Sequence, residues 1–237
     1  MSLYFILLLG SVAVPLVLSF DKKLQFYKQW KFVFPSIFIV AIFYILADIT
    51  LTKWGVWGFN PRYLSGIQIV NLPLEEWLFF IVIPYASIFL HESFVLYFPK
   101  MRLSNQLSSQ LSLIIIFIAL AVSFFNYDKI YTFYLSVLVV IATSLSLLDK
   151  TRLINSYYIS FLLILIPFLI VNAILTGSFI ENEVVWYDNN ENLGVRFLTI
   201  PIEDFGYAFS MILFNLLLIS KFKQLFGNKP KLSGNAE

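Results

Sequence analysis

Residues 32–49 read Phe-Val-Phe-Pro-Ser-Ile-Phe-Ile-Val-Ala-Ile-Phe-Tyr-Ile-Leu-Ala-Asp-Ile, a run whose only charged side chain is Asp48. A helix of about 20 predominantly apolar residues is long enough to cross the hydrocarbon core of a bilayer. The whole chain of 237 residues has the same character, with 59% hydrophobic and 13% charged residues. A soluble domain carries about 25% charged residues. The composition therefore excludes an ordinary soluble domain and indicates an integral membrane protein.

Comparable apolar runs recur along the chain and predict an all-α, polytopic membrane protein with about seven transmembrane helices. The first run ends before Lys22 and Lys23, whereas a cleaved signal peptide has its positive charges in front, so we expect a retained helix. The predicted spans are residues 3–20, 32–49, 74–98, 111–125, 131–148, 157–175 and 202–219.

The basic residues predict the orientation. Twelve of the 16 lysines and arginines fall in the loops after spans 1, 3 and 5 and in the C-terminal tail. Only Lys53, Arg62, Lys129 and Arg196 fall on the opposite side. Because cytoplasmic loops are enriched in Lys and Arg, we expect the N-terminus outside and the C-terminus in the cytoplasm. The end of the tail, residues 227–237, is polar, which is typical of disorder.

Several kinds of site are excluded by composition. The chain has no cysteine and a single histidine, His91, which removes thiolate chemistry and leaves almost no basis for a histidine metal site or a Ser-His triad. The basic residues are scattered between apolar runs, so we expect no nucleic-acid partner. His91 and Glu92, near the cytoplasmic end of their span, are expected to be structural, as is Asn172.

The chain contains an internal repeat with an offset of 128 residues. Gly66 falls on Gly194, and Leu72-Pro73-Leu74-Glu75-Glu76 falls on Ile200-Pro201-Ile202-Glu203-Asp204. Four helices separate equivalent spans, so both halves cross the membrane in the same direction and are expected to be related by a pseudo-two-fold axis along the membrane normal. The expected division is a three-helix repeat (1–98), a linking segment with helix 4 (99–130), a second three-helix repeat (131–220) and a polar cytoplasmic tail (221–237).

The paired acids Glu75-Glu76 and Glu203-Asp204 are the strongest candidates for chemistry. Proline followed by acids also suits an ordinary helix start, so a purely structural role stays open. Two symmetric copies, each with two acids at the edge of the hydrocarbon, favour function. Carboxyls in an apolar cavity can divide the roles of general acid and general base. Adjacent helical residues point about 100° apart, so one acid of each pair is expected to face a central cavity.

Aromatic and polar residues accompany the acids. Aromatic faces stabilise a nearby cation. The third helix of the first repeat carries Trp77, Phe79, Phe80 and Tyr85, and that of the second repeat carries Phe205, Tyr207 and Phe209. Trp54 and Trp57 are expected in the interfacial aromatic belt. Arg62, which follows Asn60-Pro61, and Arg196 either pair with the motif acids or are solvated in loops. Asp48 has no cationic neighbour in the sequence, and its repeat counterpart is Thr176.

These residues resemble a known family. Phe59-Asn60-Pro61-Arg62-Tyr63, Gly66-Ile67 and Leu72-Pro73-Leu74-Glu75-Glu76-Trp77-Leu78-Phe79-Phe80 resemble the first copy of the membrane-integral lycopene cyclase signature. Leu193-Gly194-Val195-Arg196 and Ile200–Asp204 resemble its second copy, without an Asn-Pro before the glycine. The likeness covers residues 1–220 and is greatest to the fused bacterial form of the family. A Gly-rich dinucleotide fingerprint, typical of flavin-dependent cyclases, does not occur.

The resemblance implies a lycopene β-cyclase, an isomerase that closes the linear ends of lycopene into β-ionone rings in a bacterial inner membrane. It implies a carotenoid substrate in the bilayer and carotenoid-pathway enzymes as partners. The chemistry requires neither a metal nor a nucleotide cofactor. Glu75 and Glu203 are the first candidates for acid and base, with Glu76 and Asp204 supporting or exchanging roles. The implied substrate-binding residues are Asn60, Arg62, Trp77, Phe79, Phe80, Arg196, Phe205 and Tyr207.

Three other classes of protein share some of these sequence features. A seven-helix retinal protein needs a lysine in its last span, and residues 202–219 contain none. A small transporter built from parallel repeats stays open, because intramembrane acids also suit solute coupling. A cyclase that forms ε- or γ-rings, or that acts on longer carotenoids with a partner subunit, stays open as well.

Overall fold

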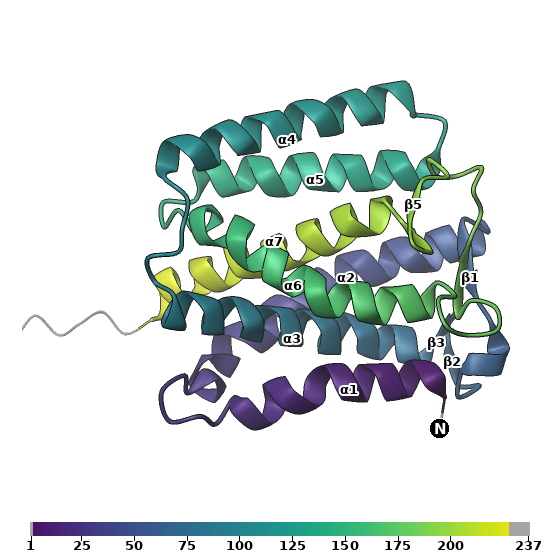
Figure 1. Ribbon diagram of the computed structural model, residues 1–237, viewed down its shortest axis with the longest axis horizontal. Helices are drawn as coiled ribbons and strands as arrows, with labels where there is room; N and C mark the ends of the chain where they lie inside the picture. The colour runs from purple at the N-terminus through teal and green to yellow at the C-terminus, as the bar shows by residue number, and fades with distance from the viewer. Residues whose placement is uncertain (1, 228–237) are drawn as a thin grey trace, which may run out of the picture.

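The computed structural model describes residues 2–227, which form seven α-helices that run along one common direction (Figure 1). Six of them are long and apolar enough to cross a membrane, and α1 is a shorter apolar helix of 16 residues. The protein is therefore an all-α polytopic membrane protein, as the apolar runs predict. The helices are α1 (Leu3–Leu18), α2 (Trp30–Lys53), α3 (Leu74–Tyr97), α4 (Asn105–Phe125), α5 (Ile130–Leu148), α6 (Ile154–Leu175) and α7 (Glu203–Phe226), and a 3₁₀ turn, η1 (Phe26–Gln29), precedes α2.

Several helices extend beyond their apolar runs, and α4 and α7 extend the furthest. The start of α4 lies at Asn105 instead of residue 111, because the Ser104 hydroxyl caps the helix by accepting from the Leu107 N–H at 3.2 Å. The end of α7 lies at Phe226, so residues 221–226 of the predicted polar tail are helical. The rest of the predicted polar tail, residues 228–237, lies outside the described residues.

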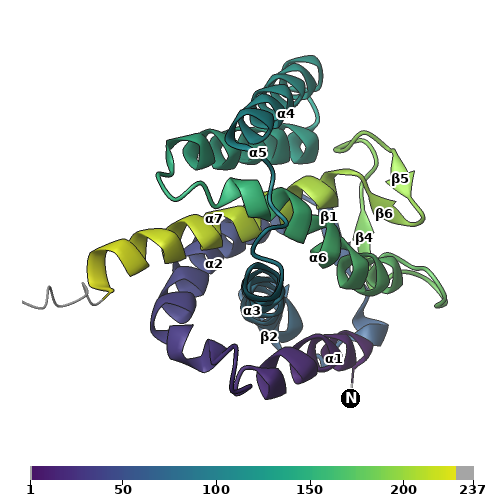
Figure 2. The same ribbon diagram turned by 60° about the vertical axis from the view of Figure 1, so that its left-hand side comes forward.

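The two halves of the chain pack in the same way. α1 packs on α3 as α5 packs on α7, and α2 contacts α7 as α6 contacts α3. α3 and α7 contact each other at the centre, and α4 lies against the outer side of α5 without a counterpart in the first half (Figures 1 and 2). The fold thus consists of two parallel three-helix repeats with one linking helix.

Short strands gather at one end of the bundle, near the N-terminus (Figure 1). They form three antiparallel pairs, each of two strands. β1 (Trp57–Phe59) pairs with β4 (Val185–Tyr187), and these strands are equivalent in the two repeats. The remaining pairs are the hairpins β2 (Gln68–Ile69) with β3 (Leu72–Pro73), and β5 (Arg196–Phe197) with β6 (Ile200–Pro201). The 3₁₀ turn η2 (Pro61–Tyr63) follows β1.

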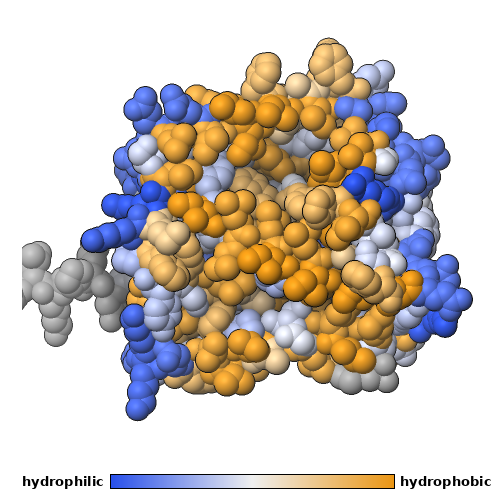
Figure 3. Space-filling view, viewed as in Figure 1, coloured by the Kyte–Doolittle hydropathy of each residue, from blue (hydrophilic) through white to orange (hydrophobic). Residues whose placement is uncertain are grey.

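The surface has the pattern of a membrane protein. A wide hydrophobic zone separates two hydrophilic ends (Figure 3). Large apolar side chains such as Phe117 and Phe124 are 74% exposed along α4. Exposed apolar surface of this extent suits lipid contact and does not suit water.

Candidate active site

Each acid pair stands at the start of a helix, directly after a hairpin. The hairpin registers are identical at the offset of 128, with Gln68 opposite Pro73 and Arg196 opposite Pro201. The turns also match, since Val70 and Leu198 adopt φ of 61° and 56°. The equivalence of these local structures places both acid pairs at the same level, at the strand-bearing end of the bundle.

Gly66 and Gly194 both occupy the left-handed region of backbone space, with φ of 85° and 69°. Glycine adopts this conformation without steric cost. These turns direct the backbone N–H of the preceding residue, Ser65 or Leu193, toward the helix start. Each repeat thereby supplies a backbone donor to the first acid of its pair.

Glu75 and Glu203 accept those donors and hold the loops onto the helices. Oε1 of Glu75 accepts from the Ser65 N–H and the Ser2 hydroxyl, both at 2.6 Å. Oε1 of Glu203 accepts from the Leu193 N–H and the Thr132 hydroxyl, both at 2.7 Å. Both carboxylates are buried and neither lines the central cavity.

Glu76 and Asp204, the second acids, face a common cavity of about 70 Å³ between the repeats. The Tyr4 hydroxyl donates to Oε2 of Glu76 at 2.7 Å. The Tyr131 hydroxyl donates to Oδ1 of Asp204 at 2.5 Å. The acids are 128 residues apart and the tyrosines 127, so each repeat contributes the same tyrosine–carboxyl pair.

A third acid, Asp48 on α2, lines the same cavity and is only 2% exposed. Its Oδ1 accepts from the Tyr207 hydroxyl at 3.2 Å. The cavity lining among residues 2–227 includes no lysine, arginine or histidine. Three carboxyl groups therefore line one cavity in which their hydroxyl hydrogen-bond donors are the phenols of tyrosines.

Tyr187, on β4, gives Asp204 a second donor at 3.1 Å to Oδ2. Burial raises the pKa of Tyr187 well above its usual value, and the nearby charge of Asp204 raises it further. Tyr187 therefore remains a neutral hydroxyl that can donate. Asp204 accepts two hydrogen bonds from phenols, whereas Glu76 accepts one.

The rest of the cavity wall is largely aromatic. Trp57 packs edge-on against Tyr131 with ring centroids 5.0 Å apart, and Phe59, Phe79 and Phe168 also line the space. The expected place of Trp57 in the interfacial belt is wrong: it is 4% exposed, because its ring lines the cavity and packs against Tyr131. Trp54, which is 63% exposed, lies where a belt residue can reach the interface.

Of the residues that the sequence proposes for substrate binding, Phe79 and Tyr207 line the cavity. Phe80 is fully buried beside Tyr44 and Tyr207. Trp77 donates to the Ile69 carbonyl of its own hairpin at 3.2 Å, and the Phe205 ring contacts Phe168. Trp77, Phe80 and Phe205 thus surround the site without lining it.

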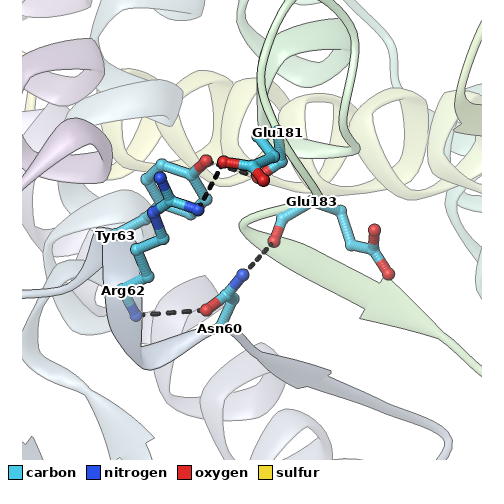
Figure 4. A network of polar contacts seen from close by, with 5 residues as sticks. All are labelled: Asn60, Arg62, Tyr63, Glu181 and Glu183. Atoms are coloured by element: carbon cyan, nitrogen blue, oxygen red, sulfur yellow. Dashed lines mark hydrogen bonds and ion pairs between the residues drawn. The ribbon is translucent and has the colours of Figure 1, made fainter.

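Asn60 and Arg62 connect the two repeats away from the cavity (Figure 4). Asn60 donates to the Glu183 carbonyl at 3.1 Å, and Arg62 forms an ion pair with Glu181 at 2.8 Å. Arg196 donates to the Thr199 carbonyl and to Asn189. Neither arginine forms an ion pair with a motif acid in the part of the chain that the structure describes, so the alternative in which they pair with these acids is wrong.

Asp48, Tyr4, Tyr131 and Tyr187 are site residues that the sequence motifs do not single out. Asp48 was recognisable as an acid within an apolar run, and Tyr4 and Tyr131 as matching positions near the starts of equivalent spans. Tyr187 had no comparable signal, since strand pairing brings it to the cavity. Within residues 2–227, no three His, Cys, Asp or Glu side chains are grouped closely enough to hold a metal ion.

One of three comparisons with known proteins gives a match. Searches of curated proteins and of solved structures each return no match. The family model described as lycopene cyclase matches two segments, residues 1–94 and 128–222, and so covers most of both repeats. The chain belongs to the lycopene cyclase family.

Proposed function

We propose that the protein is a lycopene β-cyclase, which closes the linear ends of lycopene into β-ionone rings to give γ-carotene and β-carotene. The observation that carries the proposal is the meeting of Glu76 and Asp204 in one aromatic-lined cavity. Membership of the lycopene cyclase family supports carotenoid cyclisation, and the arrangement of carboxyls suits its chemistry.

The reaction needs one acid and one base and no net oxidation. A carboxylic acid adds its proton to C2 of the terminal double bond and leaves a cation at C1. The C5–C6 double bond attacks C1, which closes the ring and moves the positive charge to C5. A carboxylate then removes the proton from C6, and the C5–C6 double bond re-forms. One proton is gained and one is lost, so the product is an isomer of the substrate.

We assign the acid to Glu76 and the base to Asp204. Hydrogen bonds to a carboxylate favour its ionised form, and Asp204 accepts two of them, from Tyr131 and Tyr187. Glu76 accepts one, from Tyr4. Ionised carboxylates that share an apolar cavity repel one another. This repulsion favours a state of the cluster in which one carboxyl is protonated. In this proposal Asp48 is the third member of the cluster.

We propose roles for Glu75 and Glu203 other than those of general acid and base. Their Oε1 atoms are occupied by a loop N–H and a hydroxyl, and they lie outside the cavity lining. We propose that they position the helix starts on which Glu76 and Asp204 stand. The aromatic wall, with Trp57, Phe79 and Phe168, would stabilise the carbocation and exclude water.

We further propose that the end opposite the strands faces the cytoplasm of a bacterial inner membrane. The loops at that end carry most of the basic residues, including Lys22, Lys100 and Lys150. The N-terminus and the carboxyl cluster would then lie toward the outer side. The functional division would follow the repeats, 1–98 and 131–220 extended to the end of α7, with 99–130 as the linking segment.

The proposal is tested by expression in a bacterium that accumulates lycopene, followed by chromatography of the pigments. We expect γ-carotene and β-carotene with β-rings, which separate from ε-ring isomers. Unchanged lycopene, with the protein detected in the membrane, would contradict the proposal. Rings of another type, or conversion of longer carotenoids only with an added partner subunit, would favour the other cyclases. Movement of an unchanged solute across the membrane would favour a transporter.

A further inference from the structure

Two apolar grooves lie on the lipid-facing sides of the bundle. The α1–α3–α6 groove has a volume of about 620 Å³, and the α2–α5–α7 groove about 860 Å³. Each is built from equivalent helices of the two repeats, because α1 corresponds to α5, α3 to α7 and α6 to α2. Residue pairs at the offset of 128 confirm the equivalence: Gly10 and Leu138, Leu90 and Leu218, and Val171 and Phe43 line the two grooves respectively.

The grooves differ in their relation to the carboxyl cluster. Five residues line both the α1–α3–α6 groove and the central cavity, so this groove adjoins the cavity that Glu76, Asp204 and Asp48 line. They are Phe79, Ile83, Phe168, Asn172 and Ala208. Among residues 2–227, none lines both the α2–α5–α7 groove and the cavity.

Two substitutions between the repeats explain this asymmetry. The position of Asn172 on α6 is occupied by Tyr44 on α2, and that of Ala208 on α7 by Phe80 on α3. The Tyr44 ring packs edge-on against Tyr207 with centroids 5.0 Å apart, and its hydroxyl is 2.8 Å from that of Ser210. Phe80 is fully buried beside it. Two large rings therefore separate the α2–α5–α7 groove from the cavity, whereas only the smaller Asn172 and Ala208 occupy these positions between the α1–α3–α6 groove and the cavity.

We propose, on the basis of the proposed function, that the α1–α3–α6 groove binds the linear polyene chain of the substrate while its end lies among the carboxyls. The α2–α5–α7 groove, closed by Tyr44 and Phe80, does not admit substrate to the cavity. The groove extends along α3 from Phe79 to Leu90, which is about 16 Å at the rise of an α-helix. Its wall is almost entirely apolar and it faces lipid, so it suits a hydrocarbon chain that arrives from the bilayer.

Gly10 offers a direct test. It lines the α1–α3–α6 groove, and a Cβ at this position would meet no other atom within 4 Å. Replacement of a helical glycine does not weaken the helix. Gly10→Trp therefore places a bulky ring at the groove, on a Cβ that meets no neighbouring atom. The matched control is Ile141→Trp, because Ile141 lines the α2–α5–α7 groove and is 44% exposed.

The experiment measures two quantities in lycopene-accumulating cells: the rate of cyclisation and the amount of lycopene that co-purifies with each variant. We expect Gly10→Trp to lose bound pigment and to lower the rate by about 100-fold, since misplaced reacting atoms cost on the order of 100-fold. We expect Ile141→Trp to match the wild type in both. Equal thermal unfolding midpoints in detergent show that both variants are folded.

Full activity and full pigment binding in Gly10→Trp would overturn the groove assignment, as would an equal loss in Ile141→Trp. The proposed function can fail separately. A wild-type protein that retains lycopene unchanged, and loses it in Gly10→Trp alone, would refute cyclisation and support the groove.

Discussion

Gly58 and Trp186 lie opposite each other in the β1–β4 pair, and they occupy the same position in the two repeats, 128 residues apart. Their neighbours exchange accordingly: Trp57 faces Tyr187, and Phe59 faces Val185. An antiparallel pair of equivalent strands requires a two-fold axis between them. The pseudo-symmetry axis of the protein therefore passes between Gly58 and Trp186, beside the cavity where Glu76 and Asp204 meet.

Gly58 is the small partner of this pair. A Cβ on Gly58 would overlap the indole ring of Trp186, so we expect Gly58→Ala to destabilise the strand pair by about 1–3 kcal/mol, the usual cost of overpacking. Thermal unfolding in detergent measures the change. Gly58→Ala combined with Trp186→Leu should recover most of the loss, and a stable single variant would show that the ring moves aside freely.

The second acid of each pair is predicted to carry the chemistry. Glu76→Gln and Asp204→Asn should each lower the rate of cyclisation by about 10²–10⁴-fold, the range for loss of a general acid or base. Glu75→Gln and Glu203→Gln are the matched controls, because an amide oxygen can still accept from Ser65 or Leu193. If the controls lose activity and the first two variants keep it, the assignment of roles is reversed.

The phenols around Asp204 are predicted to support its function. Tyr131→Phe removes a hydrogen bond to the carboxylate while it keeps the ring that packs against Trp57. A hydrogen bond to a charged group contributes about 1.5–3 kcal/mol, so we expect the cyclisation rate to fall by at least about tenfold. Tyr158→Phe is a suitable comparison, because its hydroxyl bonds Ser112 far from the cavity. An equal effect of both variants would indicate a general loss of stability.

The link between the repeats is predicted to affect stability more than catalysis. Asn60→Ala removes the donor to the Glu183 carbonyl and the cap of the 3₁₀ turn, and should destabilise the protein by about 1 kcal/mol. Arg62→Gln breaks an ion pair whose side chains are 58% and 75% exposed, so little change is expected. Unfolding midpoints and cyclisation rates of both variants check this. A large loss of activity in Arg62→Gln would instead place this arginine on the substrate.

A single open groove also predicts the order of products. The two ends of lycopene cannot reach the carboxyl cluster from opposite sides, so the one-ringed intermediate must leave, turn and bind again. We expect γ-carotene to appear before β-carotene in a time course. When the reaction starts from isotopically labelled lycopene, unlabelled γ-carotene added during the time course should dilute the label found in β-carotene. Direct formation of β-carotene without exchange would show that both ends react during one binding event.

The sequence by itself determined the membrane fold, the repeat and the two acid pairs. Apolar runs of membrane length permit few structures other than helices, because backbone polar groups have no partners in lipid. A constant offset of 128 predicted equivalent hairpins and helix starts, which the registers at Gln68 and Arg196 confirm. Local composition and spacing suffice for such features, since they depend on the bilayer and on short-range geometry.

Only the tertiary structure decided which acid of each pair faces the cavity. Glu75 and Glu76 are adjacent on one helix, and the rotation of that helix is set by contacts with α1, α2, α6 and α7, which no local pattern encodes. The same holds for Asp48, Tyr187 and Trp57, which meet through strand pairing and helix packing. The difference between the grooves likewise depends on the tertiary structure. Tyr44 and Phe80 separate one groove from the cavity, at positions where the other repeat has the smaller Asn172 and Ala208. The effect of side-chain size depends on the neighbours that helix packing supplies.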